Sequence, residues 1–343
     1  MVNDDISQAL ALYVKRQVAA DDIQILEFSR LSGGAIQSNY ALTVQCTGGQ
    51  HPGRHELVVR SDSPSTIAAS LSREQEFQVL TVAYDAGVTV PQPLWLCTDT
   101  SVIGNVFCVM RRVSGTAAGH KLVKGGLTPL QAKGFTYRLG QELALLHKVR
   151  PPDLRLASLP LLQASPAQAR IDAYRKALDA IPEPHPVLEW SLNWLEQNAP
   201  GSDGVALCHC DFRTGNYMVD DGRLTGVLDW EFAAWSDPYE DLGWLCSKSW
   251  RFGVNDKEVG GIGDKADLFQ GYASVSGLAV DPGKVLYWEI MGMTRWAVIA
   301  LQQVQRHLSG EQSSLELALT GRLLPEIEFD VLTKIGELGG FHE

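Results

Sequence analysis

The most informative stretch of the sequence reads LCHCDFRTGN at residues 207–216 and is followed by VLDWE at residues 227–231. Transfer of a phosphoryl group needs a carboxylate that accepts or orients the proton of the attacking hydroxyl. It also needs oxygen ligands that keep Mg²⁺ against a triphosphate, and carboxylate and amide oxygens serve this purpose. Asp211, Asn216 and Asp229 supply these three groups. The stretch therefore predicts phosphoryl transfer.

The spacing of these residues favours the same interpretation. Asp211 and Asn216 match the D-x-x-x-x-N pattern of the kinase catalytic loop, and an apolar strand leads into Asp229. The sequence DDG at residues 220–222 is typical of a tight hairpin turn. We expect this turn to fold Asn216 and Asp229 back toward each other.

The ordered series H-x-D-x-x-x-x-N, D-W-E and D-P-x-x-D-L, the last at residues 237–242, resembles the aminoglycoside phosphotransferase family. That family shares the protein-kinase-like fold with choline and homoserine kinases, and the similarity is greatest to the branch fused to, or encoded beside, acyl-CoA dehydrogenases. The resemblance covers residues 28–250 and implies a bilobal α+β fold with a small β-rich N-lobe and a larger, mostly helical C-lobe. It also implies ATP and Mg²⁺ as cofactors and a hydroxyl-bearing small molecule as the acceptor.

The resemblance assigns roles to the residues of the motif block. Asp211 corresponds to the catalytic base, and Asn216 and Asp229 correspond to the Mg²⁺ ligands. His209 corresponds to a histidine that supports the loop through backbone contacts. The aspartates at residues 237 and 241 correspond to a structural acidic pair.

In the front lobe, residues 32–39 resemble the loop that covers the phosphates, with Gly33, Gly34, Ser38 and Asn39 as the expected nucleotide contacts. Small residues there allow backbone N–H groups to approach the phosphates.

The strand at residues 56–60 ends in Arg60, where the kinase pattern has a phosphate-binding lysine. A guanidinium group binds phosphate well through its planar set of donors. Glu76, with Glu74 as second choice, is expected to pair with Arg60. Residues 109–112 resemble the hinge that binds adenine, with Met110 and Arg112 as its contacts.

The rest of the chain sets the wider organisation. At 343 residues the chain favours two lobes, which we place at residues 1–111 and 112–343. The front lobe should contain helices at 6–19 and 70–85 and strands at 28–31, 40–46, 56–60, 94–97 and 106–113. The back lobe should contain helices that start at Thr128-Pro129 and at residues 166 and 186, with residues 285–304 as its central helix.

Composition restricts the partners and the compartment. The net charge of −11 argues against nucleic acid or an anionic membrane as the main partner. The sequence shows neither a secretory signal nor a membrane-spanning run, and its six cysteines are scattered. We therefore expect a cytoplasmic protein with free thiols; the sequence does not indicate its oligomeric state.

Several alternatives remain open at this stage. A nucleotide-binding pseudokinase with a regulatory role is favoured by Arg60 and by Cys210, which stands where the family usually has glycine. The acceptor is an aminoglycoside, an amino alcohol or a hydroxyacyl thioester. A zinc site at Cys208-His209-Cys210 is disfavoured because no second pair of ligands follows. The tryptophans of the back lobe are expected to fill its core rather than to form a substrate cage.

Overall fold

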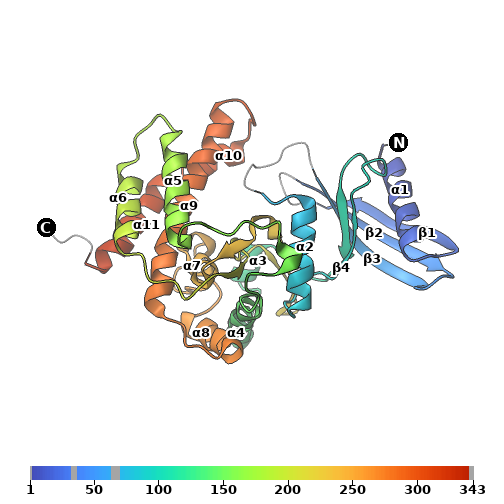
Figure 1. Ribbon diagram of the computed structural model, residues 1–343, viewed down its shortest axis with the longest axis horizontal. Helices are drawn as coiled ribbons and strands as arrows, with labels where there is room; N and C mark the ends of the chain where they lie inside the picture. The colour runs from blue at the N-terminus through green and yellow to red at the C-terminus, as the bar shows by residue number, and fades with distance from the viewer. Residues whose placement is uncertain (1, 32–36, 63–69, 340–343) are drawn as a thin grey trace. The chain divides into compact units, whose positions relative to one another are not determined.

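Contacts within the chain divide it into two units, shown together in Figure 1. The computed structural model describes residues 2–31, 37–62 and 70–339. The first unit contains the chain up to Thr116 together with Leu154–Ser158 and Tyr217–Ala233, and the second contains the remaining segments. The lobe limits given above stay a prediction.

An antiparallel sheet forms the centre of the first unit, with the described strands in the order β1-β2-β3-β5-β4. The strands are β1 (Asp22–Arg30), β2 (Gln37–Thr47), β3 (Gly53–Asp62), β4 (Pro93–Cys97) and β5 (Phe107–Arg111). Side chains alternate across β3, so that Leu57 and Val59 are buried whereas Glu56 faces outward. The five strands expected from the sequence are present, but β1 begins at Asp22, six residues before the start predicted at residue 28.

Two helices accompany this sheet, α1 (Val2–Gln17) and α2 (Arg73–Asp85). Helix α1 packs Leu10 and Val14 into the same apolar cluster as the inward residues of β2 and β3 (Figure 1). Helix α2 begins with a capping box at Ser72, and it buries Glu76, whose carboxylate pairs with Arg60 and Arg73. The helix thus fixes the carboxylate that the sequence pairs with Arg60.

A hairpin of β7 (Tyr217–Asp220) and β8 (Arg223–Val227) also belongs to the first unit, as do the 3₁₀ turns η1 (Leu154–Leu156) and η2 (Trp230–Phe232). The expected turn at residues 220–222 is confirmed. Asp221 and Gly222 have φ angles of 45° and 73°, the left-handed values that a tight hairpin of this kind requires. The hairpin leads the chain to Asp229.

The second unit is built around α9 (Pro282–Leu308), whose residues from Val285 to Leu301 are largely buried. This confirms the predicted central helix. The other helices are α3 (Gly119–Val123), α4 (Pro129–Leu146), α5 (Pro166–Asp179), α6 (Pro186–Gln197), α7 (Pro238–Cys246), α8 (Lys265–Ser276), α10 (Leu315–Gly321) and α11 (Leu324–Glu337). The 3₁₀ turn η3 (Lys248–Trp250) and the short strands β6 (Ala206–Cys208) and β9 (Ala234–Ser236) complete the described elements of the unit.

Helices α7 and α9 approach each other closely because α7 carries Gly243 at the contact. A Cβ atom at Gly243 would lie 2.4 Å from the backbone carbonyl carbon of Trp288 on α9, which a side chain at this position could not accommodate. This approach places the next residue, Trp244, against Gly292 of α9, with 3.1 Å between an ideal Cβ of Gly292 and the indole. The packing of two helices therefore sets the position of one indole ring.

No helix among the described residues is both long enough and apolar enough to cross a membrane. All six cysteines are free and buried, which confirms the expectation of free thiols.

Candidate active site

The loop at residues 209–216 follows β6 in the second unit and is fixed by a buried carboxylate of α7. Asp241 accepts the backbone N–H of His209 through Oδ2 and that of Cys210 through Oδ1, each at 2.8 Å. His209 in turn accepts the backbone N–H of Asp211 through Nδ1 at 3.2 Å. Two side chains, those of Asp241 and His209, therefore bind the backbone N–H groups of three consecutive residues, as expected for a structural aspartate and a histidine that supports the loop.

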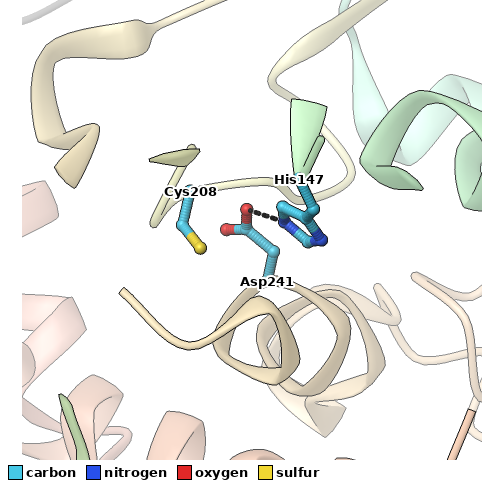
Figure 2. Close-up of side chains that lie close together, drawn as sticks. All are labelled: His147, Cys208 and Asp241. Atoms are coloured by element: carbon cyan, nitrogen blue, oxygen red, sulfur yellow. Dashed lines mark hydrogen bonds and ion pairs between the residues drawn. The ribbon is translucent and has the colours of Figure 1, made fainter. Parts of the chain in front are cut away.

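Asp241 also forms a hydrogen bond with His147, the C-cap residue of α4. Figure 2 shows the imidazole facing the carboxylate, with Nε2 at 3.1 Å from Oδ2, and its Nδ1 lies 3.1 Å from the hydroxyl of Tyr272. Burial on its own would raise the pKa of Asp241. The hydrogen bond and charge of His147, together with the charge and backbone N–H of His209, bring that pKa below its ordinary value. Asp241 is therefore ionised in the folded protein at neutral pH.

His147, Cys208 and Asp241 also form a group of three buried metal-ligand side chains whose ligand atoms all lie within 4.8 Å of one another (Figure 2). Each of these atoms already has a protein partner, since the Cys208 thiol donates to the carbonyl oxygen of Asp237 at 3.5 Å. Burial, followed by the charge of Asp241, raises the pKa of Cys208 well above its ordinary value, so the thiol stays protonated. All three side chains therefore serve as hydrogen-bonding groups of the fold, and His147 and Asp241 are bonded directly to each other.

Asp211 and Asn216 lie side by side within this loop. The Asn216 Nδ2 donates to the Asp211 carbonyl oxygen at 3.0 Å and to its Oδ2 at 2.5 Å. Since the amide nitrogen makes both bonds, the amide oxygen is the atom left to bind another group. Asp211 Oδ1 accepts two further bonds, from the Trp244 Nε1–H at 2.9 Å and from the Arg213 Nε–H at 3.2 Å.

The backbone of the loop is left-handed at Cys210, with φ of 58°. Glycine adopts this conformation without strain, whereas a residue with a Cβ does not. The thiol is buried and accepts from the Arg170 Nη2 at 3.4 Å, while the carbonyl oxygen accepts from the Arg295 guanidinium. Two arginines from α5 and α9 therefore stabilise the conformation of a residue that stands where the family usually has glycine.

Arg60, Glu76 and Asp229 form an ion cluster within the first unit. The Arg60 Nη2 lies 2.7 Å from Asp229 Oδ1 and 3.0 Å from Glu76 Oε1, so the pairing expected between Arg60 and Glu76 is present. Glu74 faces solvent. Burial opposes the charge of Arg60, but Glu76 and Asp229 raise its pKa above the ordinary value. The cluster thus places a permanent cation beside the carboxylate expected to bind metal.

Asp229 is itself in the left-handed region, with φ of 68°, just before η2. Aspartate tolerates this conformation better than most residues, and strained backbone of this kind occurs at functional sites. Its side chain is 36% exposed, whereas that of Asp211 is 10% exposed. Asp229 belongs to the first unit and Asn216 to the second, and their expected approach stays a prediction.

The remaining predicted nucleotide contacts are located only in part. Gly33 and Gly34 lie outside the described residues, and Ser38 is described only as backbone of β2. Asn39 pairs with Arg60 in the register of β2 and β3. Among the hinge residues, Met110 is buried on β5, and the backbone N–H of Arg112 donates to the carbonyl oxygen of Glu56 at 2.9 Å. The adenine-binding role of these two residues stays a prediction.

Three contacts of the loop were not predicted, those of Arg170, Trp244 and Arg295. The sequence does contain a signal for Trp244, which follows Asp241 by three residues on α7. Residues at this spacing lie on the same face of a helix, and both side chains contact the loop. Arg295 lies within α9, belongs to no motif and has no comparable signal.

The first unit thus contains a small antiparallel sheet and one ion cluster. The second unit is mostly helical and carries an aspartate and an asparagine on one loop, as in small-molecule kinases. The sequence pattern that defines the phosphotransferase enzyme family, APH, matches residues 27–278. The chain belongs to this family.

Individual proteins agree with this assignment. A candidate aminoglycoside phosphotransferase from Ralstonia eutropha JMP134 superposes with a TM-score of 0.77 at 23% identity, covering 96% of this chain and 98% of that one. The ethanolamine kinase of Plasmodium vivax superposes with a TM-score of 0.59 at 16% identity, covering 90% and 83%. These similarities show a kinase-like fold.

Among curated proteins, the mouse protein named acyl-CoA dehydrogenase family member 10 is 27% identical over 301 residues. The match covers 82% of this chain but only 28% of that relative, so the chain spans little more than a quarter of its length. The similarity to a branch associated with acyl-CoA dehydrogenases, expected from the sequence, is confirmed.

Proposed function

We propose that this chain transfers the γ-phosphate of Mg·ATP to a hydroxyl of a small molecule. Asp211 accepts or orients the proton of the acceptor hydroxyl. Asn216 and Asp229 are the ligands for Mg²⁺, which neutralises charge on the triphosphate when it is bound. Arg60 binds the α- and β-phosphates, and residues 33–39 cover the triphosphate.

The observation that carries this proposal is the arrangement of Asp211 and Asn216. A carboxylate has about four acceptor positions on its two oxygens. Two donors occupy Oδ1 and one donor occupies Oδ2, which leaves one position on Oδ2 for a hydroxyl proton. The same hydrogen bond turns the Asn216 amide so that its oxygen, a donor atom suited to Mg²⁺, is available.

The charges beside the loop are balanced and leave the acceptor class open. Arg170, Arg213 and Arg295 contact the loop, and the side chains of Arg170 and Arg213 are 27% and 26% exposed. Arg170 pairs with Glu240 and Arg213 pairs with Asp211, while Asp241 nearby is ionised. Three cations therefore face three carboxylates, and an aminoglycoside, an amino alcohol and a hydroxyacyl thioester are all acceptors to be tested.

The test is a phosphate-transfer assay of the purified chain with Mg·ATP and one acceptor from each class. We expect product with at least one of the three acceptors, and none in the variant Asp229→Ala because it lacks a metal ligand. The acceptor that is phosphorylated identifies the substrate class. Metal dependence that is unchanged in Asp229→Ala would remove that residue from its role.

A nucleotide-binding pseudokinase is the second candidate, and two observations favour it. Asp229 is engaged by Arg60 at 2.7 Å, and Cys210 occupies a conformation suited to glycine. A pseudokinase binds ATP without turning it over, so a thermal shift with Mg·ATP that is accompanied by no product with any acceptor would select this alternative.

A further inference from the structure

Trp244 is a buried group in direct contact with Asp211 that the proposed chemistry does not use. It lies on α7, is 2% exposed, and donates its Nε1–H to Asp211 Oδ1 at 2.9 Å. A buried tryptophan usually finds an acceptor for its Nε1–H, and here that acceptor is the carboxylate of Asp211. The contact therefore links the helical core to the carboxylate proposed as the base.

The indole is fixed on several sides. The Arg295 guanidinium stacks on its ring at 4.3 Å, and the ring of Trp250 meets it edge-on at 4.9 Å. Gly292 of α9 lies directly against it. Because the ring cannot rotate or withdraw, its N–H is a donor of fixed position, and Oδ1 of Asp211 must remain near it.

Fixing Oδ1 also fixes Oδ2. The carboxylate is planar, so the direction of its second oxygen follows once the first is bound and the side chain is attached to the loop. Oδ2 carries the one acceptor position that the hydrogen bonds leave open. We infer that Trp244 is a positioning residue, which orients Asp211 so that Oδ2 faces the acceptor hydroxyl; this inference rests on the proposed function.

The variant Trp244→Phe tests this role because phenylalanine keeps an aromatic ring in the core but has no N–H. We expect kcat to fall about ten- to a hundredfold, the usual value of a hydrogen bond to a charged group, with KM for ATP within about twofold. Trp288→Phe is the matched control. Trp288 is also 2% exposed, and its Nε1 has no hydrogen-bond partner among the described residues.

The same substitution in an Asp211→Ala background separates positioning from packing. If Trp244 acts through Asp211, Trp244→Phe has no further effect on the residual rate of that variant. Equal effects of Trp244→Phe and Trp288→Phe on kcat in the active protein, or a full additional loss in the Asp211→Ala background, would overturn the inference. A wild-type chain that transfers no phosphate to any acceptor overturns the proposed function instead, so the two failures are distinct.

Discussion

The loop of Asp211 and the turn of Asp229 carry the two carboxylates assigned to phosphoryl transfer, and they are stabilised by different forces. The loop of Asp211 is fixed by hydrogen bonds that its backbone donates to Asp241 and that it accepts from Trp244 and Arg295. Asp229 has an ion pair with Arg60 and a side chain that is 36% exposed. A buried hydrogen-bond network fixes geometry, whereas an exposed ion pair responds to ligands and salt. Changes near Asp211 should therefore alter kcat, and changes near Arg60 should alter nucleotide binding.

The largest effect is expected for Asp211→Asn, which removes the proton acceptor but keeps the shape of the side chain. We expect kcat to fall by about 10²–10⁴-fold, with KM for ATP little changed, as measured in a steady-state transfer assay. Asp221→Asn is the control, since Asp221 is an exposed turn residue where asparagine is equally compatible with a left-handed φ of 45°. An Asp211→Asn enzyme of nearly normal rate would remove Asp211 from the role of base.

Asp241→Asn should have the next largest effect, on stability as well as on rate. The substitution leaves His147 without its carboxylate and leaves only one oxygen for two backbone donors. We expect the free energy of unfolding to fall by about 3 kcal/mol at pH 7, as for a broken buried pair. The measurement is chemical denaturation.

The same variant makes a prediction about pH. The pKa of Asp241 is lowered in the folded state, so its ionised form stabilises the fold fully above the ordinary aspartate pKa. This contribution is lost as the pH falls below about 4, through the folded-state value. The difference in unfolding free energy between the wild type and Asp241→Asn should therefore shrink on acidification. A difference that is constant from pH 7 to about 3 would contradict this assignment.

Arg60→Met tests the ion pair beside Asp229. It removes the guanidinium but leaves Glu76 paired with Arg73, so the fold should persist. We expect KM for ATP to rise about tenfold or more, the usual value of lost charge-assisted hydrogen bonds. Arg60→Lys should recover part of this loss because it restores a cation. Arg54→Met on the same strand, where the side chain is 59% exposed, is the matched control and should leave KM unchanged. A larger effect on kcat than on KM would contradict the proposed division of roles.

The sequence predicted the features that depend on neighbours along the chain. The start of α4 at Thr128 followed from its capping signal, and the hairpin before Asp229 followed from its turn residues. The pairing of Arg60 with Glu76 could be predicted because the kinase pattern places Arg60 on its strand and Glu76 lies on the helix that follows. In each case a local rule decides the structure.

The contacts of Trp244 and Arg295 with the loop depend on tertiary packing. They require α7 to approach α9 closely, which depends on Gly243 and Gly292 lying opposite large neighbours. Neither glycine belongs to a motif, and Arg295 is 85 residues from the carbonyl that it binds.

The smallest expected effect concerns Cys210. Its backbone is left-handed, with φ of 58°, and the loop of Asp211 shares this property with the turn of Asp229, where φ is 68°. Cys210→Gly relieves backbone strain of about 1 kcal/mol or more, whereas Cys210→Ala keeps the strain, and both lose the buried thiol. We therefore expect the glycine variant to be the more stable of the two by about 1 kcal/mol in chemical denaturation.

Cys246, which is buried at the end of α7 on helical backbone, is the matched control. There the order should reverse, because glycine is about 0.5–1 kcal/mol less favourable than alanine within a helix. If the alanine variant were the more stable one at both positions, the backbone at residue 210 would not be left-handed.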